Sequence, residues 1–139
     1  MTIALIAHDS KKELMADFCR AYKHILSQHT LIATGTTGHL VEEKAGLPVQ
    51  KFMSGNLGGD QQIMTRIACN EVDMLLFLRD PIGAKPNEPF EMQLLRVCDV
   101  HNVPAATNIA TAEMLVLGLA RGDLDWRDIV NPKTKPFTA

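Results

Sequence analysis

Two glycine-rich turns carry the residue types that bind phosphate. Residues 34–38 read Thr-Gly-Thr-Thr-Gly, and residues 54–60 read Ser-Gly-Asn-Leu-Gly-Gly-Asp. Each turn follows a strand-like run and opens a helix-like segment, where backbone N–H groups and the positive end of the helix dipole attract an anion. Glycine lets the backbone approach closely, and the serine and threonine hydroxyls add donors. Because the second turn ends in Asp60, the pair predicts a phosphorylated ligand with an acid/base group beside it.

Further charged side chains follow other strand-like runs. His8 ends the first run and Lys12 lies about one turn into the helix after it, while Asp80 follows the apolar run 74–78. The sequence lacks the phosphate loop of nucleoside triphosphatases, the GxGxxG fingerprint of dinucleotide enzymes, and a Cys/His cluster suited to a structural metal. What remains predicts acid/base chemistry on a small phosphate ester, with no cofactor and no metal.

Each of these residues also has a purely structural interpretation. An aspartate at a helix start, such as Asp60, is often only a cap or a first-turn anion. His8 at a strand end fits a core histidine bonded to a backbone carbonyl, and Asp80 before a proline fits a turn residue. Thr36 and Thr37 fit caps of the second helix, although capping does not exclude phosphate binding.

Strand-like and helix-like segments alternate along the chain. Apolar runs predict the strands, and helical periodicity with capping or glycine signals predicts the helices. The first helix is expected to begin at a capping box, Ser10-Lys11-Lys12-Glu13. The predicted strands are 2–7, 30–33, 49–53, 74–78 and 103–106, and the predicted helices are 10–26, 37–45, 60–70, 89–101 and 111–121.

This alternation predicts an α/β fold, a single domain of three layers with a five-stranded, largely parallel, Rossmann-like sheet and helices on both faces. Ligands of such sheets bind beyond the carboxyl ends of the strands. The glycine-rich turns and the charged residues that follow strands therefore meet at one rim, whereas the turns of the opposite rim look generic. We expect the domain to span residues 1–130, followed by a C-terminal tail at 131–139.

Composition narrows the classes of partner. The 139 residues carry a net charge of −2 and no long run of basic residues, which argues against a nucleic-acid or anionic-membrane surface. No apolar stretch is long enough to span a membrane and the first residues do not form a signal peptide, so we expect a cytoplasmic protein. Cys19, Cys69 and Cys98 lack a CxxC pair and are expected to be reduced thiols packed in the core.

At these residues the chain resembles the methylglyoxal synthase family. The resemblance runs over nearly the whole chain, and its ATGTTG and GGDQQ strings are highly specific. It implies a methylglyoxal synthase-like fold and a lyase that converts dihydroxyacetone phosphate to methylglyoxal and inorganic phosphate, working as a homohexamer. The resemblance rests on Ala7-His8-Asp9, Ala33-Thr34-Gly35-Thr36-Thr37-Gly38, Ser54-Gly55, Gly58-Gly59-Asp60-Gln61-Gln62, Arg79-Asp80-Pro81 and Pro104-Ala105-Ala106-Thr107-Asn108.

Carried over residue by residue, the resemblance implies a role for each candidate. Asp60 would be the catalytic base that removes a proton from the carbon beside the carbonyl, and His8 with Asp80 would line the reacting end. Inorganic phosphate would leave as product and is a candidate inhibitor. The implied substrate- and phosphate-binding residues are His8, Lys12, Thr34, Gly35, Thr36, Thr37, Ser54 and Gly55.

One loop departs from the family pattern, which reads Pro-His-Glu-Pro-Asp where this chain reads Pro-Asn-Glu-Pro-Phe at residues 86–90. The family histidine is an electrophile toward the carbonyl. Asn87, kept here as a catalytic candidate, can donate a hydrogen bond but cannot shuttle a proton, and it also fits an N-cap of the next helix. Phe90, where the family has a supporting aspartate, can do neither. Glu91 is not expected to replace the lost acid, because one helical position turns a side chain by about 100°.

Two functions follow from these observations. The first is an active methylglyoxal synthase in which the polarisation of the carbonyl is altered. The alternative is a catalytically weak or silent relative that binds a phosphorylated metabolite as a sensor or regulatory module. Asn87 and Phe90 are the residues that separate the two.

Overall fold

Five parallel strands form the sheet that positions the site. In this computed structural model, which describes residues 1–83 and 88–130, the central strand β1 pairs with β2 and β4, and Ala7 of β1 lies opposite Leu78 of β4. The predicted α/β class and parallel sheet are confirmed, although β3 and β5 are shorter than predicted. The strands are β1 (Thr2–Ala7), β2 (Thr30–Ala33), β3 (Gln50–Lys51), β4 (Met74–Leu78) and β5 (Ala105–Ala106), in the order β3-β2-β1-β4-β5.

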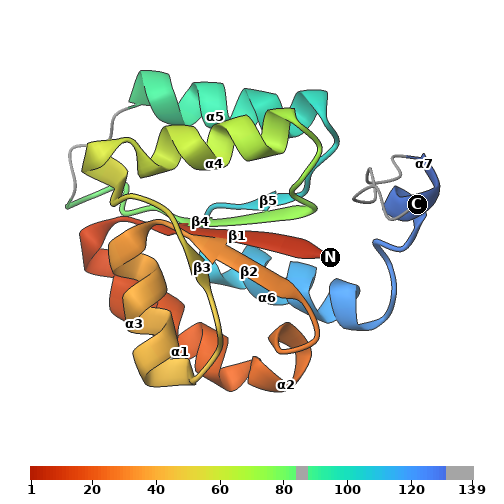
Figure 1. Ribbon diagram of the computed structural model, residues 1–139, viewed down its shortest axis with the longest axis horizontal. Helices are drawn as coiled ribbons and strands as arrows, with labels where there is room; N and C mark the ends of the chain where they lie inside the picture. The colour runs from red at the N-terminus through yellow and green to blue at the C-terminus, as the bar shows by residue number, and fades with distance from the viewer. Residues whose placement is uncertain (84–87, 131–139) are drawn as a thin grey trace, which may run out of the picture.

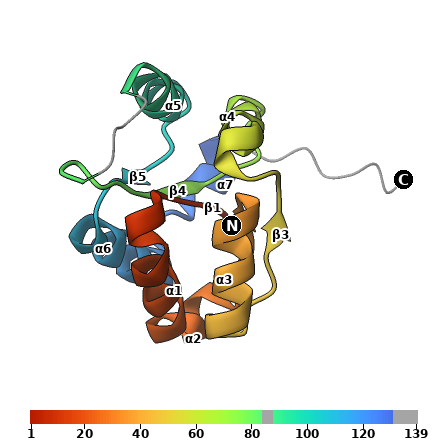
Figure 2. The same cartoon turned by 90° about the vertical axis from the view of Figure 1, so that its left-hand side faces the viewer.

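Helices cover both faces of this sheet, as predicted. On one face lie α1 (Lys12–Ala21), α2 (Lys23–Leu26), α3 (Gly35–Ala45) and α6 (Ile109–Ala120), and on the other lie α4 (Gly59–Ala68) and α5 (Glu88–Val100) (Figure 1, Figure 2). The remaining described elements are the 3₁₀ turns η1 (Asp9–Lys11) and η2 (Gly55–Leu57) and the helix α7 (Trp126–Val130). In the described part of the chain, no helix is long and apolar enough to cross a membrane.

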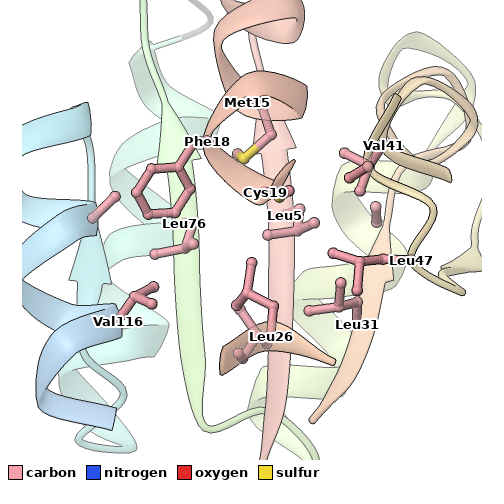
Figure 3. Close-up of a cluster of buried hydrophobic side chains, with 14 of the residues drawn as sticks. Leu5, Met15, Phe18, Cys19, Leu26, Leu31, Val41, Leu47, Leu76 and Val116 are labelled. Atoms are coloured by element: carbon pink, nitrogen blue, oxygen red, sulfur yellow. The ribbon is translucent and has the colours of Figure 1, made fainter. Parts of the chain in front are cut away.

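The core has two layers, one on each face of the sheet. Alternate residues of a strand point to opposite faces of the sheet. Ile3 and Leu5 of β1 therefore pack toward α1, α3 and α6, while Ala4 and Ile6 pack toward α4 and α5. Figure 3 shows the first layer, in which side chains from these three helices converge on Leu5 and its neighbours. The two layers fix the strand ends whose loops form the site.

The first helix differs from its prediction. Ser10 does not cap it: the residue lies in η1, and its Oγ donates to Asp80 Oδ2 at 2.5 Å. α1 begins at Lys12 instead, and the backbone leaves helical geometry at Tyr22 (φ −105°, ψ 22°), which separates α1 from α2. The capping-box prediction was wrong because a carboxylate distant in the sequence takes the serine hydroxyl.

The three cysteines divide into two buried and one exposed. Cys19 and Cys98 are buried as predicted, and burial raises the pKa of their thiols to about 12 and about 11, which keeps them protonated and unreactive. Cys69 is exposed. The core prediction was wrong there because Cys69 follows the last residue of α4 and precedes the turn at Asn70, which has a φ of 59°.

A buried ion pair closes the amino end of the sheet. Arg127 of α7 is 2 % exposed, and its Nε donates to Asp73 Oδ1 at 3.3 Å. Its other nitrogens donate to the carbonyl of Val72 and to those of residues 101–102. Asp73 Oδ2 also accepts from the N–H of Thr2 at 2.8 Å. This rim looked generic in the sequence, but α7 ties it together.

Candidate active site

An open cavity of about 1020 Å³ lies at the carboxyl ends of the neighbouring strands β1 and β4. The chain runs from β1 through β2 to β3 on one side and then returns past β1 to β4, so this is the switch point at which such folds bind ligands. The structure brings most of the predicted site residues together here. Those that line the cavity are His8, Lys12, Thr34, Thr36, Ser54, Gly55, Asp60 and Asp80.

Thr34 begins the first of the two glycine-rich turns, predicted above to bind phosphate and called phosphate loops here, as the N-cap residue of α3. Its backbone is extended (φ −64°, ψ 152°), and its buried hydroxyl donates to Thr37 Oγ1 at 3.4 Å. The Gly35 N–H donates to the Met53 carbonyl at 3.2 Å. A Cβ on Gly35 would lie 2.9 Å from the carbonyl oxygen of Phe52. Gly35 therefore ties this loop to the residue before the second loop, Thr37 is buried and does not line the cavity, and Thr36 is exposed and lines it.

The second phosphate loop depends on glycine at two positions. Gly58 has a φ of 100°, in the left-handed region that favours glycine. At Gly59 a Cβ would lie 1.8 Å from the Met53 carbonyl oxygen, so no larger residue fits. The Ser54 carbonyl accepts from the Gly59 N–H at 3.1 Å and closes the loop. This closure starts α4 at Gly59 and places Asp60 in its first turn.

The Asp60 carboxylate lies against this loop and lines the cavity. Its Oδ1 is 3.1 Å from the point where a Cβ would stand on Gly55, so the missing side chain there makes room for it. Burial raises the pKa of Asp60 and the negative charge of Glu91 raises it further, whereas the protonated form of His8 and the ammonium of Lys12 lower it. A half-buried carboxylate whose pKa is raised is a stronger base than an exposed one.

Two fixed partners hold the ring of His8. Its Nδ1 accepts from the backbone N–H of Asp80 at 2.8 Å, and its Nε2 lies 2.7 Å from Glu91 Oε1. Because Nδ1 accepts, the ring proton resides on Nε2, which donates to the carboxylate. The ring also meets Phe77 edge-on, with centroids 5.5 Å apart. Both ring nitrogens of His8 are therefore engaged, and the ring offers no bare nitrogen at the cavity wall.

The Asp80 carboxylate builds the loop after β4. Oδ1 accepts from the N–H groups of Ile82 at 3.0 Å and Gly83 at 2.8 Å, and Oδ2 accepts from Ser10 Oγ. These bonds, that from Ser10 foremost, lower the pKa of Asp80 to about 2. Asp80 is thus an anion at neutral pH, and it is its backbone N–H that contacts His8.

Lys12 supplies a cation at the rim of the cavity. Its Nζ donates to Asp9 Oδ1 at 2.7 Å, and this bond lowers the pKa of Asp9. The Asp9 side chain is 96 % exposed, whereas that of Lys12 is 20 % exposed. Exposed ion pairs contribute only about 0–1 kcal/mol. A phosphate dianion can therefore displace Asp9 and take the ammonium group.

Glu91 is also a cavity residue, a placement that the sequence analysis did not predict. It is 4 % exposed, and its Oε2 accepts from Arg79 Nη2 at 2.9 Å. A helical turn of about 100° separates Glu91 from Phe90. In the structure this turn directs Glu91 toward the sheet. Glu91, Leu94 and Cys98 form the buried face of α5 at the spacing i, i+3, i+7. That spacing is the sequence signal that could have revealed it.

Part of the altered loop lies outside the described residues. Asn87 is in the segment 84–87, so its catalytic role stays a prediction. Residues 131–139 also lie outside the described residues, so their assignment as a C-terminal tail stays a prediction. Phe90 is half-buried and lines the cavity. Among the residues that the structure does describe, no group of His, Cys, Asp or Glu is arranged to hold a metal ion.

The fold and the cavity define a class of protein: a parallel α/β domain with two glycine-rich loops and a half-buried carboxylate at its switch point. The sequence pattern of the MGS-like domain matches residues 14–107. A methylglyoxal synthase of Caldicellulosiruptor saccharolyticus is 65 % identical to the chain over 133 residues, which cover 96 % of this chain and 94 % of that relative.

Two further comparisons agree. A methylglyoxal synthase of Listeria monocytogenes is 58 % identical over 129 residues, covering 93 % of this chain and 96 % of the relative. The crystal structure of methylglyoxal synthase from Elizabethkingia anophelis superposes with a TM-score of 0.78 at 36 % identity, over 99 % of this chain and 93 % of that one. The chain belongs to the methylglyoxal synthase family of enzymes.

Proposed function

We propose that this protein converts dihydroxyacetone phosphate to methylglyoxal and inorganic phosphate. The observation that carries the proposal is the half-buried Asp60 carboxylate, with its raised pKa, in the same cavity as the two phosphate loops. Membership of the methylglyoxal synthase family supports the choice of substrate. The reaction needs only acid/base groups and a site for phosphate, and the cavity offers both.

Substrate binding uses the two phosphate loops. In the first turn of α3 the Gly35 N–H donates to the Met53 carbonyl, while helix geometry leaves the N–H groups of Thr36 and Thr37 without a partner within the helix. The helix dipole adds partial positive charge beside Thr34 and Thr36. Lys12 leaves Asp9 and pairs with the phosphate. The hydroxyl-bearing carbon beside the carbonyl then lies toward Asp60.

Proton transfer begins the reaction. Asp60 takes a proton from that carbon, and the electron pair left behind forms an enediolate whose negative charge collects on the carbonyl oxygen. The Nε2–H of His8 donates to Glu91, and the carbonyl oxygen would share this hydrogen as a second acceptor; such preorganised donors lower the barrier. The Asn87 amide is a second donor where the family has a histidine.

Elimination completes the reaction. The C–O bond to phosphate breaks and its electron pair leaves on the phosphate oxygen, while the hydroxyl on the deprotonated carbon gives up its proton and becomes the aldehyde. The enol of methylglyoxal remains and tautomerises to the product by taking a proton at its terminal carbon. Cleavage is favoured when this bond stands perpendicular to the enediolate plane, because the electron pair then overlaps with the bond that breaks. Holding the phosphate at Thr34 and Ser54 while the proton leaves toward Asp60 is how the loops would impose that geometry.

The resemblance to the family supports further proposals. We infer a homohexamer in the cytoplasm, with residues 1–130 as the catalytic unit and 131–139 as a tail. Inorganic phosphate, the second product, competes with substrate for the same two loops and therefore inhibits.

Incubation of the purified protein with dihydroxyacetone phosphate tests the proposal. We expect methylglyoxal and inorganic phosphate in equal amounts. Asp60→Asn is nearly isosteric and removes the base, so kcat should fall by about 10²–10⁴-fold while phosphate binding, measured by calorimetry, persists. The exposed Asp17→Asn serves as the matched control and should keep full activity.

Two outcomes would contradict the proposal. If the parent protein binds phosphate but releases no methylglyoxal, it is the silent binding relative that the altered loop allows for. If Asp60→Asn stays within a few-fold of the parent, another group is the base.

A further inference from the structure

We propose that Glu91 is a positioning residue for this reaction: it fixes the orientation and the tautomer of His8, which keeps the ring from acting as the base and leaves that role to Asp60. The inference rests on the proposed function, because it assigns the division of labour between two side chains of that reaction. Its geometry does not depend on the altered loop.

The contacts of His8 show which ring nitrogen holds the proton. The backbone N–H of Asp80 occupies Nδ1 at 2.8 Å, and only Nε2 remains for the ring proton. Glu91 Oε1, 2.7 Å from Nε2, accepts the hydrogen bond from this N–H and fixes the rotation of the ring about its Cβ–Cγ bond. A carboxylate is an acceptor only, so it excludes the tautomer in which Nε2 is bare.

Glu91 is a carboxylate buried at a position where packing alone would favour an apolar residue. It is 4 % exposed on a helix face that continues with Leu94 and Cys98, where an apolar side chain would satisfy packing. Each of its oxygens has one partner, His8 for Oε1 and Arg79 for Oε2. A buried ion pair is weak evidence for stability, because an apolar pair of similar volume is often as stable. The carboxylate therefore requires a reason other than packing, and the bond to His8 supplies it.

The charges that face Asp60 determine how Glu91 affects its pKa. They are His8 and Lys12 from the β1–α1 side and Glu91 from α5, and burial acts on Asp60 as well. Asp80 and Asp9 also line the cavity, with their carboxylates bound to Ser10 and Lys12. Of the groups that act on Asp60, Glu91 is the one whose charge raises its pKa, so the residue that orients the donor also strengthens the base.

The test is the pH profile of kcat/KM for the parent, Glu91→Gln and Glu91→Asp. In Glu91→Gln we expect kcat/KM to fall at least tenfold with KM within about threefold, since the phosphate loops are untouched. The acid limb should move to lower pH, because Asp60 loses a neighbouring negative charge. Glu91→Asp keeps the charge and should leave the acid limb in place while kcat falls.

Glu42→Gln is the matched control. Its carboxylate also uses both oxygens, for the Val49 N–H and the Lys51 ammonium, but it lies outside the cavity. We expect its pH profile to coincide with that of the parent. If Glu91→Gln coincides as well, or if its acid limb does not move, the positioning role is overturned.

A second measurement needs no substitution of Glu91. In protein labelled with ¹⁵N-histidine, the signals of His8, assigned from their loss in His8→Gln, should report a protonated Nε2 and a bare Nδ1. A proton on Nδ1 would overturn the inference. This readout does not use turnover, so a parent protein that makes no methylglyoxal refutes the proposed function and still leaves the positioning of His8 to be decided by the spectrum.

Discussion

The two ends of the sheet each hold a buried carboxylate paired with an arginine, and the two pairs are built differently. At the amino end, Asp73 and Arg127 are 3 % and 2 % exposed, and backbone carbonyls take the remaining guanidinium nitrogens. At the carboxyl end, Glu91 is equally buried, but its partners are Arg79 and His8, and His8 faces a cavity.

The two arginines also differ in how many of their guanidinium nitrogens have a hydrogen-bond acceptor. All three guanidinium nitrogens of Arg127 donate, whereas the buried Nε of Arg79 has no acceptor among the described residues. A fully partnered buried charge locks one arrangement, while a partly partnered one leaves capacity for a ligand or for a change of protonation. This difference supports our proposal that the carboxyl end carries out the chemistry, while the amino end holds the domain together.

Breaking the amino-end pair should give the largest effect. Arg127→Met leaves Asp73 buried without its cation, and such losses cost about 3–5 kcal/mol. We expect a lower midpoint in chemical unfolding and an unchanged kcat below the unfolding temperature. Arg79→Met is the matched substitution at the other end and should lower kcat more than stability. Equal losses of kcat in the two variants would refute the separation of roles.

The altered loop offers a gain of function. Since Glu91 already provides the carboxylate that holds His8, Asn87→His alone should raise kcat/KM about tenfold to a hundredfold, or 1.4–2.7 kcal/mol. Adding Phe90→Asp would place a second carboxylate beside a buried one and should destabilise the fold without further gain. Steady-state kinetics of both singles and the double variant check this. A double variant that exceeds the product of the singles would show that Glu91 does not fill that role.

Substitution of Gly55 probes the base through its neighbour. In Gly55→Ala the new methyl carbon would stand 3.1 Å from Asp60 Oδ1 and 3.3 Å from Oδ2, tighter than an ordinary contact, so the carboxylate must shift. We expect kcat to fall about tenfold, since catalysis depends on placement within a fraction of an ångström. Gly118→Ala, where the nearest neighbour is an Asp123 side-chain oxygen at 3.3 Å on a different face, is the control and should retain activity.

The smallest expected effect is on stability and follows from the raised pKa of Asp60. A carboxyl group whose pKa is higher in the folded state than its ordinary 3.8 destabilises the fold once pH exceeds the folded pKa, and has no such effect when it is protonated in both states. Asp60→Asn should therefore unfold at a higher temperature than the parent at pH 7 and at about the same temperature near pH 3. A lower unfolding temperature at pH 7 would contradict the assigned shift.

What the sequence could predict is what local chemistry determines. Parallel strands appear as apolar runs, and β4 was predicted to the residue, because periodicity reports burial. The glycine-rich loops and the place of Asp60 in the first turn of a helix were predictable, because glycine, hydroxyls and a helix start are neighbours in the chain. Phosphate binding by these loops and the role of Asp60 as the base stay predictions. Glu91 was not, because its partner His8 lies 83 residues away and only packing decides which face of α5 meets the sheet. Ser10, 70 residues from Asp80, was misassigned for the same reason.

The most direct test of the central claim is a crystal structure with a phosphate-bearing hydroxamate that mimics the enediolate. The account predicts that its phosphate binds at the Thr34–Thr36 and Ser54–Gly55 loops with Lys12, and that its hydroxamate lies within hydrogen-bond distance of Asp60 and of His8 Nε2. A mimic bound elsewhere, with this rim empty, would contradict the assignment of the carboxyl end as the active site.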